Sequence, residues 1–160
     1  MQPRIEFGVE SAAYRAMLQL ERYVQGSGIQ ATLLELIKIR ASQINGCAFC
    51  IDMHAKDARL NGETEQRIYA LSAWRETPFY TLEERAVLVL TEAVTLVATN
   101  SVSDEIFDEV SRYFTPDEIT NLLMAIATIN SWNRIAITTR MVPGTYEPQA
   151  LQNRKTASEV

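Results

Sequence analysis

Residues 35–71 read ELIKIRASQINGCAFCIDMHAKDARLNGETEQRIYAL and contain both cysteines and the single histidine of this 160-residue chain. The first part has apolar residues at helical spacing, and Asn45-Gly46 then breaks the pattern. A second helix is predicted to start at about Asn45 and to end near Asn61-Gly62. The stretch therefore predicts two consecutive helices, with the cysteines at the beginning of the second.

The remaining segments also have helical periodicity. Apolar positions recur from residue 10 to 24, and capping boxes stand at residues 81–84 (TLEE) and 115–118 (TPDE), each ahead of an apolar run. Ser103 is placed to cap a further helix, and residues 75–81 (RETPFYT) read as a linker. Because no segment alternates with period two, the sequence predicts an all-α bundle of about six to eight helices.

The composition excludes several classes of protein. The chain has 15 basic and 20 acidic residues, which gives a net charge of -5 and argues against nucleic-acid binding. No apolar run is long enough for a membrane span and the start of the chain is unlike a signal peptide, so we expect a cytoplasmic protein. The length suits a single domain over residues 1–160, with a polar tail at about 146–160.

Cys47, Cys50 and His54 are spaced three and four residues apart, so on one helix they share a face. A zinc site would need a fourth ligand, either Glu35 or water. The cysteines could also be small buried residues beside a surface histidine. The third interpretation is a redox dithiol: the pair can close to a disulfide, while His54 and the helix N-terminus favour a thiolate. A reducing cytosol favours a functional cysteine pair over a structural disulfide.

The same residues resemble the alkylhydroperoxidase D-like (AhpD-like) family of the carboxymuconolactone decarboxylase superfamily. Its core has a glutamate, eleven residues, a CxxC pair and a histidine four positions later, which Glu35, Cys47, Cys50 and His54 match. The similarity continues through WRETPFY, LTEAVT and INSWNRIAITTR and covers about residues 15–145. It implies a single-domain, all-α fold that forms homo-oligomers, which we expect to be built on trimers.

The resemblance also implies an activity, the reduction of hydrogen peroxide or alkyl hydroperoxides by the dithiol, with a Glu/His proton relay. No metal, flavin or haem is implied. A lipoyl-type or thioredoxin-like dithiol would supply the electrons. In the family the second cysteine is taken to attack peroxide and the first to resolve the intermediate, which implies that Cys50 attacks and Cys47 resolves. Because Cys47 stands at the end of the predicted helix, we expect it to be the more accessible of the two.

Two physical arguments bear on these roles. The helix N-terminus favours a thiolate at Cys47, whereas a histidine at i+4 favours a larger decrease in the pKa of Cys50. Glu35, from the preceding helix, could orient His54; without the resemblance it would read as a solvated residue paired with Lys38 or an arginine. Phe49 stands where well-studied members have an additional histidine. Two further hypotheses remain: a redox sensor or disulfide reductase module, and a decarboxylase-like enzyme on the same scaffold.

Overall fold

The computed structural model describes residues 2–5, 8 and 11–148. This part of the chain is all-helical, as predicted, and contains no strand. Its elements are α1 (Ala12–Gln25), α2 (Ala31–Asn45), α3 (Ala48–Leu60), α4 (Glu65–Ala70), the 3-10 helix η1 (Leu71–Glu76), α5 (Leu82–Thr95), α6 (Asp104–Ser111) and α7 (Pro116–Thr139). Among these described helices, none has the length and apolarity that a membrane crossing requires.

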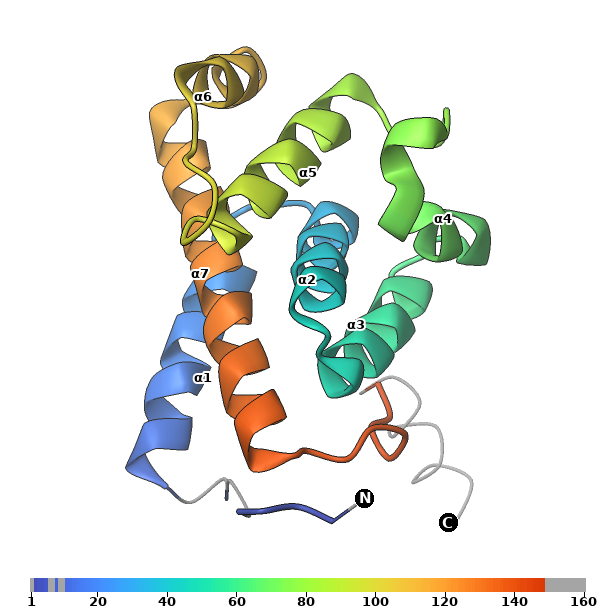
Figure 1. The fold of residues 1–160 in the computed structure, drawn as a ribbon, viewed down its shortest axis with the longest axis vertical. Coiled ribbons are helices and arrows are strands. Elements are labelled where there is room, and N and C mark those ends of the chain that lie inside the picture. The colour runs from blue at the N-terminus through green and yellow to red at the C-terminus, as the bar shows by residue number, and fades with distance from the viewer. Residues whose placement is uncertain (1, 6–7, 9–10, 149–160) are drawn as a thin grey trace.

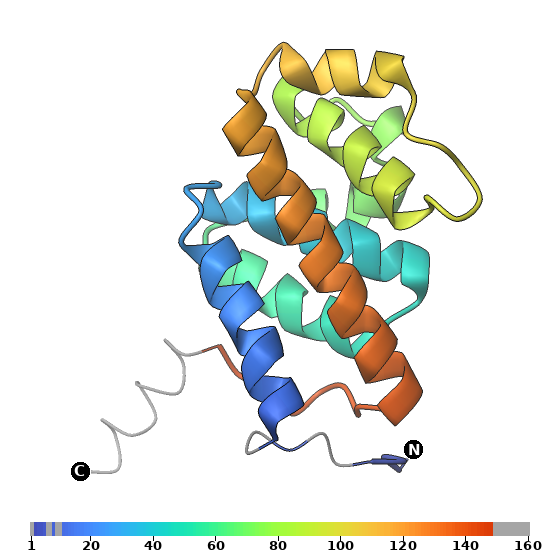
Figure 2. The same ribbon diagram turned by 90° about the vertical axis from the view of Figure 1, so that its left-hand side faces the viewer.

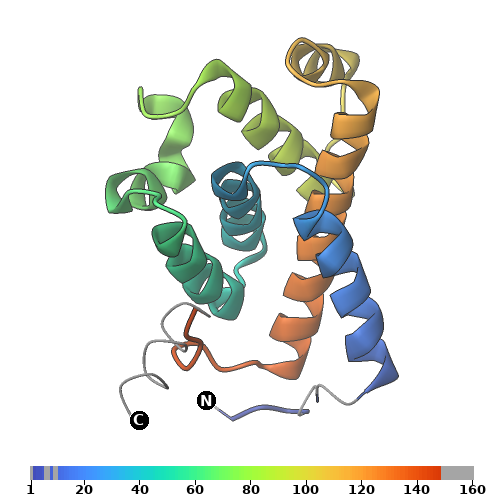
Figure 3. The same ribbon diagram turned by 180° about the vertical axis from the view of Figure 1, so that it is seen from behind.

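Helix α2 lies at the centre of the bundle. Figures 1 and 3 show it surrounded by α3, α5 and α7, and it contacts all three. Leu33 and Ile37 pack into one apolar cluster with α5 and α7, whereas Leu36 and Ile39 pack into another with α3, η1 and α5. Because α2 is covered on several sides, its apolar residues are not confined to one stripe. The central helix therefore provides a fixed support for residues that project from its neighbours.

Helix α7 is the longest element and runs diagonally along the molecule beside α1 (Figure 2). Both predicted capping boxes are present. Thr81 accepts a hydrogen bond from the amide of Glu84 at the start of α5, and Thr115 accepts one from Glu118 at the start of α7. Ser103 occupies the N-cap of α6, but its side chain makes no capping hydrogen bond. The two helices with complete caps frame α2 from two sides.

The segment before the predicted linker contains more structure than the sequence indicated. Residues 65–76 form α4 and η1, and only residues 77–81 connect them to α5. Trp74 on η1 is 3% exposed and donates its indole N–H to Glu92. These helices are short and η1 contains a non-helical residue, Ala73, so apolar periodicity could not develop over a full window. They close the side of the bundle next to α3.

After α7 the chain crosses to α3, where Tyr146 donates its hydroxyl to Asp57 and Pro148 is buried. The segment runs along the lower end of the bundle in Figure 1. The polar tail expected from residue 146 falls mostly on residues 149–160, which lie outside the described residues. Residues 146–148 themselves pack against α3.

Candidate functional site

A left-handed turn positions the cysteine pair. Gly46 ends α2 with φ 70° and ψ 31°, and Cys47 follows as the N-cap of α3. Cys50 then lies in the first turn of α3. Both residues are 1% exposed and pack with Ala41, Ile129 and Ala136. The expectation that Cys47 is the more accessible cysteine is therefore wrong, because α7 covers both thiols.

The two thiols are hydrogen-bonded to each other, with Cys50 as the donor. This bond is the main cause that lowers the pKa of Cys47 to about 7, helped by the backbone amides at the start of α3. The same bond, followed by burial, raises the pKa of Cys50. Sharing one proton between the two sulfurs therefore favours the thiolate at Cys47. The predicted lowering of the pKa of Cys50 by His54 is not found, because sharing its proton with Cys47 outweighs any effect of the histidine.

Asn133 on α7 supplies a polar contact above the thiols. It is fully buried, and its amide hydrogen-bonds to both sulfurs, lowering the pKa of each cysteine. Its Oδ1 accepts a bond of 2.9 Å from Asn45, and its Nδ2 donates to Ser42 Oγ at 2.9 Å. These two bonds fix which end of the amide carries the hydrogens, so the donor end faces Ser42 and the sulfurs. The site is thus not a purely apolar cysteine cluster.

Glu35 and His54 form the second half of the site. Glu35 Oε2 lies 2.8 Å from His54 Nδ1, and their side chains are 8% and 6% exposed. Lys38 lies 3.6 Å from the other oxygen of Glu35 and 2.5 Å from Glu21 on α1. Glu35 is therefore not the solvated residue considered from sequence, although its pairing with Lys38 is present. The carboxylate holds one ring nitrogen of His54 and leaves Nε2 for other partners.

Asp57, one turn beyond His54 on α3, extends this group. Ligand atoms of Glu35, His54 and Asp57 all lie within 4.8 Å of one another. A cation could be accommodated by such a set, but Glu35 is hydrogen-bonded to His54 and Asp57 to Tyr146. In the described part of the chain, neither cysteine belongs to this group. The zinc site considered from sequence, with both cysteines and His54, therefore has no counterpart here.

Most residues of this site lie in a region that matches a known protein family. Residues 11–93, from α1 into α5, match the carboxymuconolactone decarboxylase family. The chain belongs to the carboxymuconolactone decarboxylase family. The matched region includes Glu35, Cys47, Cys50 and His54, whereas Asn133 and Tyr146 lie beyond it.

Relatives place this family member in the AhpD-like group. A crystal structure of ATU0492 from Agrobacterium tumefaciens, a protein of unknown function proposed to be the antioxidant defence protein AhpD, has 44% identity and a TM-score of 0.87; it covers 91% of this chain and 100% of that one. The uncharacterized protein YdfG of Bacillus subtilis (strain 168) is 51% identical over 77% of this chain and 84% of its own. The debrominase Bmp8 shares the fold, with a TM-score of 0.74 and 22% identity over 82% of this chain and 71% of that one.

Four residues of this family member were missed from sequence: Ser42, Asp57, Asn133 and Tyr146. Asn133 was included in the sequence analysis only as part of the segment INSWNRIAITTR. Its signal was a second asparagine, Asn130, three residues earlier, so that both amides fall on one face of the helix. Asp57 has the charged neighbours of an ordinary exposed helix, and Tyr146 lies in a polar segment. For these two residues only the tertiary structure reveals the connection.

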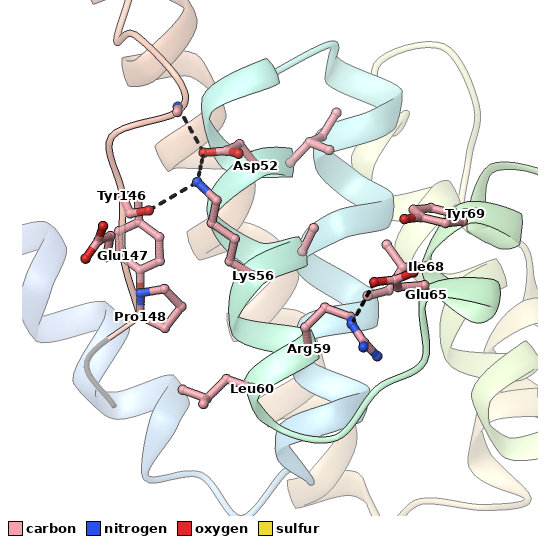
Figure 4. A pocket seen from close by; sticks show the side chains of 13 residues that line it. Asp52, Lys56, Arg59, Leu60, Glu65, Ile68, Tyr69, Tyr146, Glu147 and Pro148 are labelled. Atoms are coloured by element: carbon pink, nitrogen blue, oxygen red, sulfur yellow. Dashed lines mark hydrogen bonds and ion pairs between the residues drawn. The ribbon is translucent and has the colours of Figure 1, made fainter. Parts of the chain in front are cut away.

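A groove of about 920 Å³ lies on the outer side of α3 (Figure 4). Its walls are α3, the start of α4 and residues 144–148, and Tyr146 lines it. Neither cysteine is among its lining residues. Tyr146 connects the groove to the Glu35–His54 site, because its hydroxyl donates to Asp57.

Proposed function

We propose that this protein is a thiol-dependent peroxidase that reduces hydrogen peroxide or alkyl hydroperoxides with the Cys47–Cys50 pair. The observation that carries the proposal is the placement of Cys47 at the N-cap of α3 and of Cys50 in its first turn, within one packed cluster. At this position the interaction with Cys50 lowers the pKa of Cys47 to about 7. A thiolate at neutral pH beside a second thiol is what a disulfide-forming peroxidase needs. His54 lies further along the same helix, where it is hydrogen-bonded to Glu35 of α2.

The chemistry balances without a cofactor. A thiolate attacks one oxygen of the peroxide, the O–O bond breaks, and the leaving oxygen takes a proton to become water or an alcohol. The attacking sulfur is left as a sulfenic acid, which the second thiol attacks to form a disulfide and release water. A lipoyl-type or thioredoxin-like dithiol then reduces the disulfide by thiol exchange.

We assign attack to Cys50 and resolution to Cys47, as the resemblance to the family implies. The resting charge on Cys47 does not prevent this, because moving one proton within the Cys50–Cys47 hydrogen bond transfers the charge without moving either sulfur. His54, held by Glu35, donates the proton that the leaving oxygen needs. Phe49 packs against the cysteine cluster where other members have a histidine, so in this chain that proton task falls to His54.

Decarboxylase-like chemistry on this scaffold is the second candidate. It is favoured by the burial of both sulfurs and by an acid–base group, Glu35, His54 and Asp57, that does not include them. A third possibility is a redox sensor or disulfide reductase module, in which the cysteine pair is oxidised and reduced without peroxide turnover.

We further propose that the protein is cytoplasmic and forms a homo-oligomer built on trimers, as the family resemblance implies.

Stopped-flow peroxide consumption with dihydrolipoamide, thioredoxin or glutathione separates these functions. We expect turnover with at least one dithiol and its loss when Cys47 and Cys50 are both replaced by serine. Thiol oxidation without turnover by any reductant would favour the sensor. No thiol oxidation by peroxide would refute the peroxidase and leave the decarboxylase-like candidate.

A further inference from the structure

Asp57 is a carboxylate beside the Glu35–His54 pair that the proposed peroxidase mechanism does not use. It is half-buried and faces Glu35 and Lys38 on α2, His54 on its own helix and Tyr146 from the C-terminal segment. Lys38 is in turn paired with Glu21 on α1. When His54 carries a proton, two cations therefore face three carboxylates, a surplus of negative charge around the imidazolium.

Tyr146 holds Asp57 in this position. Its hydroxyl lies 2.8 Å from Asp57 Oδ1 and 3.0 Å from Oδ2. The backbone around Tyr146 is attached to the same helix, because Lys56 Nζ donates to the Tyr146 carbonyl at 3.1 Å and the Gly144 amide donates to Asp52 at 3.0 Å. Figure 4 shows this segment lying alongside α3 at the edge of the groove. Several hydrogen bonds therefore join α3 to residues 144–146, which are distant from it in sequence.

We propose that Asp57 is a third acid–base member of the Glu35–His54 site, a positioning residue that stabilises the protonated form of His54 and is itself held by Tyr146. The inference rests on the proposed peroxidase function, in which His54 takes up and returns a proton. An anion within 4.8 Å of the imidazole favours the imidazolium by Coulomb attraction. Burial raises the pKa of Asp57, while the hydroxyl of Tyr146 favours its ionised form.

The chain offers a direct readout, because it contains a single histidine. The proton NMR signals of His54 can be followed against pH in the reduced protein, without assignment and without peroxide. In Asp57→Asn we expect the titration midpoint to move to lower pH by about one unit, since the nearby negative charge is lost. Tyr146→Phe, which keeps the ring and removes the hydroxyl, should give a smaller shift in the same direction.

Asp52→Asn is the matched control. Asp52 lies on α3, carries the same charge and binds the same C-terminal segment through Gly144, but it does not belong to the His54 group. The variant should leave the histidine midpoint unchanged, whereas Asp57→Glu should restore most of the wild-type value. A shift in Asp52→Asn equal to that in Asp57→Asn would show that the segment, and not the Asp57 charge, is responsible, and would overturn the inference.

An unchanged midpoint in folded Asp57→Asn also overturns the inference. If Asp57→Asn does not fold, as judged by circular dichroism, an unchanged midpoint in Tyr146→Phe has the same meaning. Thiol loss in the wild-type protein is measured separately with peroxide. Absence of that loss refutes the peroxidase, while the histidine titration still decides whether Asp57 acts on His54.

Discussion

At the scale of single residues, the Glu35–His54 contact was expected from the sequence and is present in the structure. Its 2.8 Å hydrogen bond was anticipated from a glutamate nineteen positions before the histidine, and it lies in a buried site. Such a carboxylate fixes the tautomer and orientation of a histidine ring. In the proposed peroxidase, Glu35 therefore has a chemical role as well as a structural one.

Replacing Glu35 with glutamine should separate these two roles. The amide keeps the shape and can still bond to His54 but loses the charge, so we expect peroxide-dependent thiol loss to slow by about 10-fold or more with little change in fold. Quench-flow measurement of free thiols gives the rate, and circular dichroism checks the fold. An unchanged rate would return Glu35 to a purely structural role.

The cysteines provide a pH-dependent prediction. The pKa of Cys47 is about 7 in the folded chain, against an ordinary value of 9.0. The folded protein therefore loses this proton at a lower pH than the unfolded chain does. The contribution of the Cys47 thiolate to the free energy of unfolding grows between pH 7 and 9 and is lost as the pH falls through 7.

Thiolate absorbance in the ultraviolet should show one group per chain titrating near pH 7. In Cys50→Ser that midpoint should change, because the thiol donor is replaced by a hydroxyl; a midpoint near 9 in the wild type would contradict the assignment.

Trapping with dimedone distinguishes attack from resolution. In Cys47→Ser a sulfenic acid should accumulate at Cys50, whereas Cys50→Ser should react with peroxide slowly. Fast reaction and trapping at Cys47 in Cys50→Ser would show that the resting charge, and not the position beside the His54 turn, determines which sulfur attacks.

At the scale of elements, the turn between α2 and α3 determines where the cysteines lie. Gly46 has φ 70°, and a Cβ added there would meet nothing within 4 Å, so Gly46→Ala acts through backbone conformation alone. We expect a loss of about 1 kcal/mol in the free energy of unfolding, measured in urea, together with slower thiol loss. Gly62→Ala, at φ 93° beyond α3 and equally open, is the matched control. It should lose similar stability and keep its rate; an equal decrease in rate would argue against a special role for the Gly46 turn.

Helix boundaries with strong local signals could be predicted from the sequence. The capping boxes of α5 and α7 are examples, because their side chains bond to the neighbouring backbone. The Asn45-Gly46 break is another, because glycine readily adopts the left-handed conformation that ends α2. The role of Asn133 could not be predicted, since it depends on α7 crossing the start of α3. The same is true of the Asp57–Tyr146 bond, which joins residues 89 positions apart. Contacts between distant segments are set by packing, which no local pattern encodes.

At the scale of the whole molecule, self-association depends on the apolar side chains that the fold leaves exposed. The apolar runs at residues 87–98 and 122–129 are only partly buried. Val87, Leu88, Leu90, Leu122, Ile126 and Ile129 lie in the core, whereas Leu96, Val97 and Leu123 are exposed. Other exposed apolar side chains are Tyr69 at 73% and Leu60 at 47% beside the groove, and Leu82 at 70%. Light scattering across micromolar dilutions should still return a multiple of 18.1 kDa, with three copies expected. A constant 18.1 kDa would refute the oligomer.

Whether the Cys47–Cys50 pair is redox-active is decided by the intact mass of the protein after exposure to a small excess of peroxide. A Cys47–Cys50 disulfide predicts the loss of two hydrogens and of two free thiols per chain, both reversed by dithiothreitol. An unchanged mass with both thiols still free would contradict the proposed peroxidase, and Cys47 and Cys50 would then be two buried residues of the core.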